Sequence, residues 1–346
     1  MEKKDLTGKM KKVCVLGAGS WGTALSTVLA NNCERVALWG LPQDGIEDMK
    51  VVRENRRLLP GVHLAEAIEP TTDLQAAMKD AELVLGVVPS HAMRPVLGQA
   101  KEYVTPDMYF LNCAKGLEVS TGKRMSEVFL DVLGEDARDR LAVLSGPSHA
   151  EEVGRGIPTA VAIAAYAPET AEKIQQVFMT PRFRAYTNPD IVGLELGGTL
   201  KNIVALAAGM LAGLGYGDNT QAALITRGLA EMMRMGKALG GQLHTFSGLS
   251  GLGDLVVTCA SEFSRNRRAG YLLAQGKPLP EVLEEVGMVV EGINATRIIY
   301  KLAQERGVEM PICEACHRIL DEGASPHEEA VRLMTRQGKD EMKDLL

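Results

Sequence analysis

Val13-Cys14-Val15-Leu16 runs directly into Gly17-Ala18-Gly19-Ser20-Trp21-Gly22, and a helix-forming segment follows. This order predicts a buried strand, a G-x-G-x-x-G turn and an amphipathic helix, the arrangement that holds the pyrophosphate of a dinucleotide. Gly17 permits the tight turn, Gly19 leaves room for the phosphates, and Gly22 lets the helix pack closely on the strand. The helix N-terminus adds unpaired N–H groups and partial positive charge. The motif therefore favours a dinucleotide site over an ordinary glycine-rich turn.

Further apolar runs without alternation follow along the first half of the chain, as expected for parallel strands covered on both faces. Several end in Gly, Pro, Ser or Lys, which suit a ligand-binding crevice at the strand ends. Together they predict an α/β fold with a Rossmann-type, doubly wound parallel sheet. The runs are Val36–Trp39, Leu83–Val88, Tyr109–Cys113, Leu141–Leu144 and Thr159–Ala164.

The second half of the chain has a different character. Leu194–Leu214 and Ala222–Leu239 are rich in helix-forming residues, and no strand signal of comparable strength follows them. A length of 346 residues favours two domains over one. We therefore expect a dinucleotide-binding Rossmann domain over residues 10–192, and an all-α domain for substrate binding and catalysis over residues 193–346.

Composition narrows the classes of partner. The formal net charge is -6, and no basic block stands out beyond Arg265–Arg268, which argues against a nucleic-acid partner. Residues 1–12 are polar and lysine-rich, without the apolar stretch of a signal peptide. No uninterrupted apolar run approaches the ~18 residues of a membrane span. We expect a cytoplasmic protein without a membrane span.

One cysteine motif suggests a cofactor. Cys313-Glu314-Ala315-Cys316-His317 spells C-x-x-C-H, the pattern of c-type haem attachment, but the chain lacks an export context and a second pair of zinc ligands. We expect no metal site, and interpret the cysteines as reduced, structural neighbours on a helix that begins near Met310-Pro311. Any other role of this motif stays open. The six cysteines are Cys14, Cys33, Cys113, Cys259, Cys313 and Cys316.

The residues after the second expected strand bear on the choice of cofactor. An acid about 20 residues beyond the glycine motif would bind the ribose 2′-OH of NAD. Gly40-Leu41-Pro42-Gln43 contains none, and Asp44 is the first acid. The nearest arginines, Arg53, Arg56 and Arg57, are more simply explained as a solvated helix face. We expect NADPH or NADH, with NADPH slightly favoured.

Two lysines are candidates for chemistry. Lys115 follows a strand end, where a ligand contact and a surface turn are equally good explanations. Lys201 lies in the otherwise apolar run Leu196–Val204, so it is either on an exposed stripe or buried for a purpose. Burial lowers the pKa of a lysine and suits it to protonate the alkoxide that hydride delivery to a carbonyl creates. Asp254 is placed to orient that lysine or to cap a helix.

A basic cluster at Ser264-Arg265-Asn266-Arg267-Arg268 is a candidate anion site. If a helix starts here, Ser264 caps it, its first N–H groups face an anion, and Arg265 can hold a phosphate bidentately. The alternative is a solvated basic helix face.

Together with the motifs given below, these residues show that the chain resembles the bacterial-type NAD(P)-dependent glycerol-3-phosphate dehydrogenases from about residue 12 to 340. Several long motifs in the right order are more specific than any single one. They are G-A-G-S-W-G-T-A-L at 17, V-V-P-S-H at 87, A-K-G-L-E at 114, S-G-P-S at 145, L-G-G-T-L-K-N-I at 196, N-T-Q-A-A-L-I-T-R-G-L-A-E at 219, G-L-G-D-L at 251, S-R-N-R-R at 264, V-V-E-G at 289 and M-P-I at 310.

The resemblance implies roles residue by residue. Lys201 resembles the family's proton-transfer lysine, with Lys115 and Asp254 beside it as catalytic residues. Leu41 departs from many relatives, which carry a basic or histidine side chain there, and this weakens the case for a strong NADPH preference. The implied substrate-binding set is Lys115, Gly146, Ser148, Asp254, Ser264, Arg265 and Asn266. The implied cofactor-binding set is Gly17, Gly19, Ser20, Trp21, Gly22, Lys115, Ala150, Arg265, Val289 and Glu291.

The implied activity is the interconversion of dihydroxyacetone phosphate and sn-glycerol 3-phosphate, which supplies phospholipid synthesis. Two alternatives stay open: another two-domain Rossmann dehydrogenase acting on a hydroxyacid or sugar acid, and a non-catalytic NAD(P)H-sensing module. The sequence leaves the oligomeric state and feedback inhibition open, although a glycine-rich helical domain is suited to packing as a homodimer.

Overall fold

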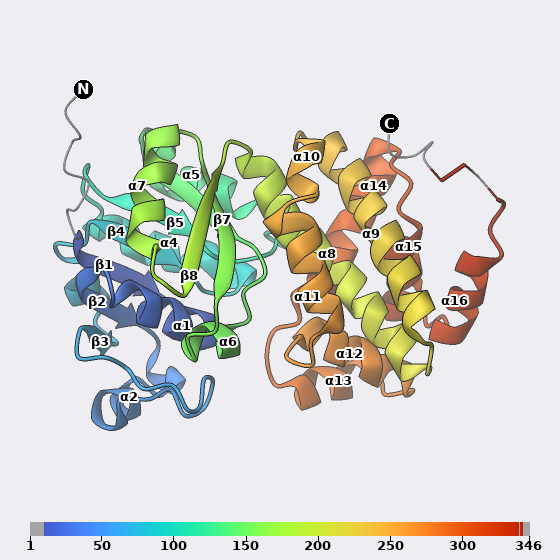
Figure 1. The fold of residues 1–346 in the computed structure, drawn as a ribbon, viewed down its shortest axis with the longest axis horizontal. Helices are drawn as coiled ribbons and strands as arrows, with labels where there is room; N and C mark the ends of the chain where they lie inside the picture. Colours follow the sequence, from blue (N-terminus) through green and yellow to red (C-terminus); the bar gives the residue numbers. More distant parts are fainter. Residues whose placement is uncertain (1–9, 339, 342–346) are drawn as a thin grey trace. The chain divides into compact units, whose positions relative to one another are not determined.

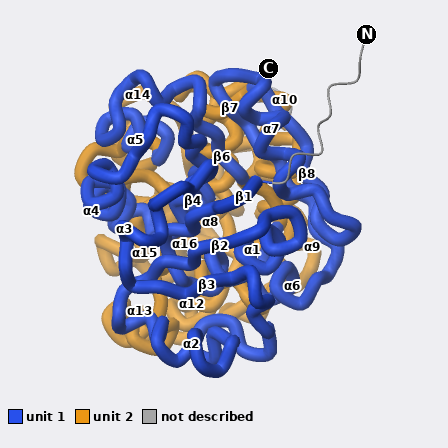
Figure 2. Tube along the Cα trace, turned by 90° about the vertical axis from the view of Figure 1, so that its left-hand side faces the viewer, with its two compact units in different colours: residues 1–114, 125–144, 148–189 blue, residues 115–124, 145–147, 190–346 orange. Residues whose placement is uncertain are grey.

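The structure, a computed structural model, describes residues 10–338, 340 and 341. The part of the signal-peptide expectation that rests on residues 1–9 lies outside these residues. The described chain forms two compact units (Figure 2). Unit 1 comprises residues 10–114, 125–144 and 148–189, and unit 2 comprises residues 115–124, 145–147 and those from 190 onward.

Unit 1 is built on an eight-stranded sheet (Figure 1). The strand order is β3-β2-β1-β4-β5-β6-β7-β8, and β1 pairs in parallel with both β2 and β4. The order therefore reverses between β1 and β4, the switch point at which such sheets bind ligands. The strands are β1 Met10–Leu16, β2 Cys33–Trp39, β3 Ile68–Thr71, β4 Leu83–Gly86, β5 Tyr109–Asn112, β6 Leu141–Ser145, β7 Thr159–Ala165 and β8 Phe183–Asn188.

Helices cover both faces of this sheet, which confirms the doubly wound prediction. Val13 and Val15 of β1 pack in one apolar cluster with α1, α2, α6 and α7, whereas Cys14 and Leu16 pack in another with α3, α4 and α5. Both faces are apolar, so the strands read as continuous apolar runs. The helices are α1 Ser20–Leu29, α2 Ile46–Val52, α3 Leu74–Met78, α4 Ser90–Ala100, α5 Met125–Leu133, α6 Ala150–Gly154 and α7 Pro168–Phe178.

The two edge strands, β3 and β8, were not among the expected runs. β3 has four residues and contains Pro70, which is tolerated at a sheet edge. β8 alternates buried and exposed residues from Phe183, so it lacks a continuous apolar run. Edge strands need less burial than central ones, and their sequence signal is correspondingly weak.

Unit 2 is helical, as expected for the second half of the chain. Its central helix, α8, is buried along most of its length. It is long and apolar enough to cross a membrane, but 89% of its 18-residue apolar stretch is buried inside the protein, as in a core helix. The helices are α8 Ile191–Gly213, α9 Asp218–Ala238, α10 Leu243–Phe246, α11 Asp254–Ala260, α12 Arg265–Ala274, α13 Leu279–Val286, α14 Glu291–Arg306, α15 Pro311–Asp321 and α16 Pro326–Met334.

Glycines allow α12 to pack against the backbone of α8. A Cβ at Gly270 would lie 1.9 Å from the carbonyl oxygen of Leu206, and one at Gly209 would lie 1.9 Å from that of Arg267. The two helices run in the same direction, because their contacts advance together from Asn202 with Asn266 to Gly213 with Ala274. This close approach sets the register that places the N-terminus of α12 beside Asn202, the neighbour of Lys201.

A buried carboxylate connects two sequence motifs in which no catalytic or binding residue is predicted, the ones that begin at residues 219 and 310. Glu231 on α9 accepts hydrogen bonds from the backbone N–H groups of Ile312 (2.7 Å) and Cys313 (3.3 Å). It therefore caps the N-terminus of α15, which begins at Pro311 as predicted.

The C-x-x-C-H cysteines lie on this same helix as buried neighbours. Burial raises the pKa of the Cys316 thiol to about 12, so that thiol is a poor nucleophile. Among the described residues, no three His, Cys, Asp or Glu side chains are grouped to hold a metal ion.

Candidate active site

The carboxylate of Asp254 is shared by two lysines. Its Oδ1 accepts a hydrogen bond from Nζ of Lys201 at 2.6 Å, and its Oδ2 accepts one from Nζ of Lys115 at 2.7 Å. The side chains of Asp254, Lys201 and Lys115 are 2%, 7% and 19% exposed. All three belong to unit 2 and come from the start of α11, the middle of α8 and the segment after β5.

Two more groups hold the lysines in place. Thr258 Oγ1 accepts a hydrogen bond from Lys201 Nζ at 2.7 Å and donates one to the Asp254 carbonyl oxygen at 2.6 Å. The carbonyl oxygen of Gly146 accepts a hydrogen bond from Lys115 Nζ at 2.9 Å. Both ammonium groups are therefore oriented by fixed oxygen acceptors.

The electrostatics of the cluster favour proton transfer by Lys201. Burial lowers the pKa of Lys201 to about 8, opposed by the charge of Asp254 and assisted by that of Lys115. Burial alone would raise the pKa of Asp254, but the two ammonium groups hold that pKa below its usual value. Lys201 is thus mostly protonated at neutral pH, yet close enough to its pKa to release the proton readily.

Gly198 of α8 provides a surface for the Lys115 side chain. A Cβ at Gly198 would lie 2.7 Å from the Ser145 hydroxyl and 3.4 Å from Cγ of Lys115. The Ser145 hydroxyl is buried and has no hydrogen-bond partner among the described residues. A buried hydroxyl without a partner, near the Lys115 side chain, is an unused polar group that a substrate oxygen can satisfy.

The N-terminus of α12 is tied to α8 and α14 through asparagines. Ser264 caps α12 by accepting a hydrogen bond from the N–H of Arg267, as predicted. Asn266 donates to Asn202 Oδ1 at 2.9 Å and accepts from the N–H of Gly292 at 2.8 Å. This buried chain brings the start of α12 next to the residue that follows Lys201.

The same helix start carries the predicted phosphate arginine. Arg265 donates a hydrogen bond to the carbonyl oxygen of Val289 at 3.2 Å. Glu291 begins α14 two residues later. The structure thus brings Arg265, Val289 and the start of α14 together within unit 2.

In unit 1, the glycine turn has the geometry that a pyrophosphate requires. Gly17 has φ +123°, and a Cβ at Gly22 would lie 1.9 Å from the carbonyl oxygen of Gly17, so neither position tolerates a side chain. A Cβ at Gly19 would meet nothing within 4 Å, which leaves the space that the phosphates need. Ser20 begins α1, and the indole Nε1 of Trp21 is buried without a hydrogen-bond partner among the described residues. The turn therefore fits a dinucleotide.

The expectation that Arg53, Arg56 and Arg57 lie on a solvated helix is wrong. The helix α2 ends at Val52, and Arg53 has φ +57°, which stops it. Arg53 instead donates to loop carbonyl oxygens, while Arg56 and Arg57 form surface ion pairs. The chain turns here because the side-chain amide of Asn55 donates a hydrogen bond to the carbonyl oxygen of Ala18 in the glycine turn.

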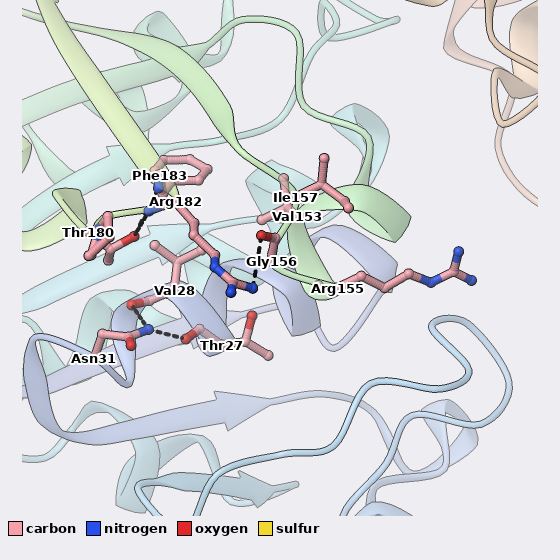
Figure 3. A pocket seen from close by; sticks show the side chains of 12 residues that line it. Thr27, Val28, Asn31, Val153, Arg155, Gly156, Ile157, Thr180, Arg182 and Phe183 are labelled. Atoms are coloured by element: carbon pink, nitrogen blue, oxygen red, sulfur yellow. Dashed lines mark hydrogen bonds between the residues drawn. The ribbon is translucent and has the colours of Figure 1, made fainter.

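The remaining predicted residues of unit 1 lie after β6. Ser148 is half-buried, and Ala150 begins α6. A separate pocket of about 450 Å³ lies between the C-terminal part of α1 and the segments that precede β7 and β8, and no predicted site residue lines it (Figure 3). Its lining includes Val28, Val153 and Phe183 with Arg182, whose guanidinium donates to the carbonyl oxygen of Gly156.

Sequence reasoning missed several residues of these sites, namely Asn55, Ser145, Asn202 and Thr258. Asn202 directly follows Lys201 in the chain, so its place next to the lysine was the available signal. Thr258 lies one helical turn after Asp254, a spacing that puts both side chains on one face of α11. No local pattern marks Asn55 or Ser145, because their neighbours come from distant parts of the chain.

Comparisons with known proteins point to the same family for both halves of the chain. Residues 12–171 match the family described as NAD-dependent glycerol-3-phosphate dehydrogenase N-terminus, and residues 190–331 match the corresponding C-terminus. The chain is 53% identical to the glycerol-3-phosphate dehydrogenase [NAD(P)+] of Syntrophomonas wolfei over 97% of this chain and 98% of that protein. It is 49% identical to the Bacillus subtilis protein of the same name, with the same coverage.

Solved structures give the same result. The crystal structure of glycerol-3-phosphate dehydrogenase from Coxiella burnetii superposes with a TM-score of 0.89 at 38% identity, covering 95% of this chain and all of that one. A ketopantoate reductase from Ralstonia eutropha superposes with a TM-score of 0.58 at 16% identity, so the likeness to that enzyme extends to the fold alone.

Proposed function

The chain belongs to the NAD(P)-dependent glycerol-3-phosphate dehydrogenases, which interconvert dihydroxyacetone phosphate and glycerol 3-phosphate, and on this premise we propose that Lys201, Asp254 and Lys115 form its proton-transfer centre. The observation that carries the proposal is the burial of Lys201 against Asp254. Ion pairs are costly to bury, and one placed in the core of the helical unit serves chemistry better than stability.

NAD(P)H, when bound, supplies the hydride that reduces the carbonyl carbon. Lys201 donates a proton from Nζ to the oxygen that becomes the new hydroxyl, and takes it back in the oxidative direction. Lys115 adds a second positive charge that stabilises the developing alkoxide. Asp254 keeps both ammonium groups in place, and Thr258 fixes the direction of the Lys201 Nζ–H bonds.

The phosphate of the substrate is assigned to the start of α12. The first N–H groups of this helix, capped by Ser264, attract an anion, and Arg265 and Asn266 offer further donors. Lys115, Asp254, Gly146 and Ser148 complete the substrate set that the family resemblance implies. The unpartnered hydroxyl of Ser145 is an additional candidate contact.

The dinucleotide is assigned to the glycine turn of unit 1. The open space at Gly19 and the unpartnered indole of Trp21 support this placement. The remaining implied cofactor contacts stay proposals on the resemblance alone. The full proposed set is Gly17, Gly19, Ser20, Trp21, Gly22, Lys115, Ala150, Arg265, Val289 and Glu291.

In the cell, we assign the protein to the cytoplasm, where it supplies glycerol 3-phosphate for phospholipid synthesis from a small phosphate substrate. Among the residues that the structure describes, the one helix long and apolar enough to span a membrane, α8, is a core element, which supports a protein without a membrane span. A homodimer with NADPH slightly favoured over NADH completes the proposal.

The test follows the absorbance of NADPH and NADH in the presence of dihydroxyacetone phosphate, with ketopantoate and a 3-oxoacid, the oxidised partner of a 3-hydroxyacid, as controls. We expect oxidation of either cofactor with the triose phosphate and none with the control compounds. Turnover of a control compound in place of the triose phosphate would overturn the assignment, and binding of NADPH without any turnover would favour a sensing module.

A further inference from the structure

We infer that Arg57, held beside Asp44 at the end of β2, is the residue that recognises the 2′-phosphate of NADPH. This inference rests on the proposed placement of the dinucleotide at Gly17–Gly22. In a Rossmann-type sheet, the adenosine ribose lies at the end of the second strand, where an acid binds the 2′-OH or an arginine accommodates a 2′-phosphate. The identities and contacts of the residues at this strand end therefore decide between the two cofactors.

The loop after β2 lies directly against the glycine turn. The N–H of Gly17 donates to the carbonyl oxygen of Trp39 at 2.9 Å, where β2 ends. A Cβ at Gly40 would lie 2.7 Å from Cβ of Ala18 and 3.2 Å from Oδ2 of Asp44. The Asp44 carboxylate is therefore close to the turn that is assigned to the pyrophosphate, at the end of β2.

Asp44 is already engaged within the loop. Its Oδ2 accepts a hydrogen bond from the N–H of Leu41 at 2.8 Å, and its Oδ1 lies 3.4 Å from Nη2 of Arg57. An acid that caps its own loop and faces an arginine is a weaker acceptor for a ribose hydroxyl than a free carboxylate. Leu41, which is 44% exposed, adds no charge to this strand end.

Asn55 places Arg57 at this position. The buried amide of Asn55 donates to the carbonyl oxygen of Ala18 at 3.0 Å and to Thr23 Oγ1 at 2.9 Å. Its Oδ1 accepts a hydrogen bond from the N–H of Leu58 at 3.1 Å. The segment that carries Arg57 is thereby anchored to the glycine turn and to α1, the elements assigned to the dinucleotide.

The Arg57 guanidinium is available for an anion. Its side chain is 59% exposed, and a surface ion pair of this kind contributes little to stability, so the arginine can turn to a stronger partner at little cost. Its planar fork suits bidentate binding of a phosphate.

The two nearby arginines differ from Arg57 in their placement. Arg53 uses its guanidinium on the carbonyl oxygens of Leu64 and Ile68. Arg56 is 63% exposed and pairs with Glu54 at 3.8 Å, which makes it a matched surface control.

The test is isothermal titration calorimetry of the full-length protein with adenosine 2′,5′-bisphosphate, NADPH and NADH. For Arg57→Ala, we expect the Kd for the bisphosphate and for NADPH to rise by about tenfold or more, the equivalent of one lost charge-assisted phosphate contact. The Kd for NADH should stay within about twofold. For Arg56→Ala, we expect all three values to stay within about twofold of wild type.

Asp44→Asn provides the opposite test. The asparagine can still accept the hydrogen bond from Leu41 but no longer repels a 2′-phosphate, so the Kd for NADPH should fall while that for NADH changes little. An Arg57→Ala variant that binds NADPH as wild type does, or that loses both cofactors equally, would overturn the inference. In that case, unchanged NADH binding and triose phosphate reduction by the wild type would leave the proposed function standing. Failure of the wild type to bind either dinucleotide would contradict both.

Discussion

Lys201 and Asp254 form a buried ion pair in which Nζ lies 2.6 Å from Oδ1 and the two side chains expose 7% and 2% of their surface. The desolvation of such a pair offsets much of its attraction, so it contributes little to folding. Its value lies in the chemistry: the lysine keeps its proton near neutral pH, in a fixed direction and at a lowered pKa.

The pH dependence of the two reaction directions should be opposite. Because burial lowers the pKa of Lys201 to about 8, kcat/KM for reduction should fall as the pH rises through about 8, where the proton donor is lost. In the oxidative direction, kcat/KM should rise through the same pH. Steady-state rates from pH 6 to 10 test this, and parallel profiles in the two directions would contradict it.

Asp254→Asn should change both the pH profile and the stability. Without the carboxylate, Lys201 loses the charge that raises its pKa, so the reductive profile should shift to lower pH. The buried ammonium group of Lys201 and the partly buried one of Lys115, left without a counter-ion, should lower the free energy of unfolding by about 3–5 kcal/mol. Urea unfolding and rate profiles measure the two effects.

The matched control for that variant is Asp321→Asn. Asp321 also belongs to a close ion pair, with Arg297, but these two side chains are more exposed, at 24% and 45%. We expect a loss of less than about 1 kcal/mol and an unchanged pH profile. Equal losses in the two variants would show that burial of the Asp254 cluster has no special importance.

Glu231→Gln should remove a pH-dependent part of the stability. Burial raises the pKa of Glu231 from 4.5 to about 7, against the two backbone N–H groups that lower it. The folded protein therefore binds this proton more tightly than the unfolded chain. This group stabilises fully below pH 4.5, and its contribution, ~3 kcal/mol at most, is lost as the pH rises through about 7.

Glutamine keeps the cap on Ile312 but cannot ionise. Wild type should thus lose stability relative to Glu231→Gln between about pH 4.5 and 7, as measured by unfolding free energies. Glu305→Gln, at an exposed position of α14, should follow the wild-type curve. The same slope in all three proteins would rule out Glu231 as its source.

Local sequence predicts the architecture of this chain because its central strands and helices each carry their own signal. The glycine turn needs particular residues at particular spacings, and strands covered on both faces need unbroken apolar runs, as in Val13–Leu16. The edge strands β3 and β8 have neither requirement. The helix expected around Arg53 fails because a long-range contact, Asn55 with Ala18, overrides the local pattern.

The arrangement of the candidate site depends on contacts that no local pattern contains. Asp254 lies 139 residues from Lys115 and 53 from Lys201 along the chain. Their residue types suggested chemistry, and the resemblance suggested their association, but the sharing of one carboxylate by two lysines is a product of the helix packing. The same holds for the asparagine chain between α8, α12 and α14, which depends on the register set at Gly209 and Gly270.

The most direct test of the account is kcat for reduction of dihydroxyacetone phosphate by Lys201→Met, measured beside the Kd for NADH. We predict that kcat falls by about 10²–10⁴-fold, the contribution of a positioned proton donor, while the Kd for NADH is nearly unchanged. Lys301→Met, at a position 78% exposed on α14, should retain wild-type kcat. A Lys201→Met variant that is folded and keeps most of its kcat would contradict the assignment of Lys201 as the proton donor.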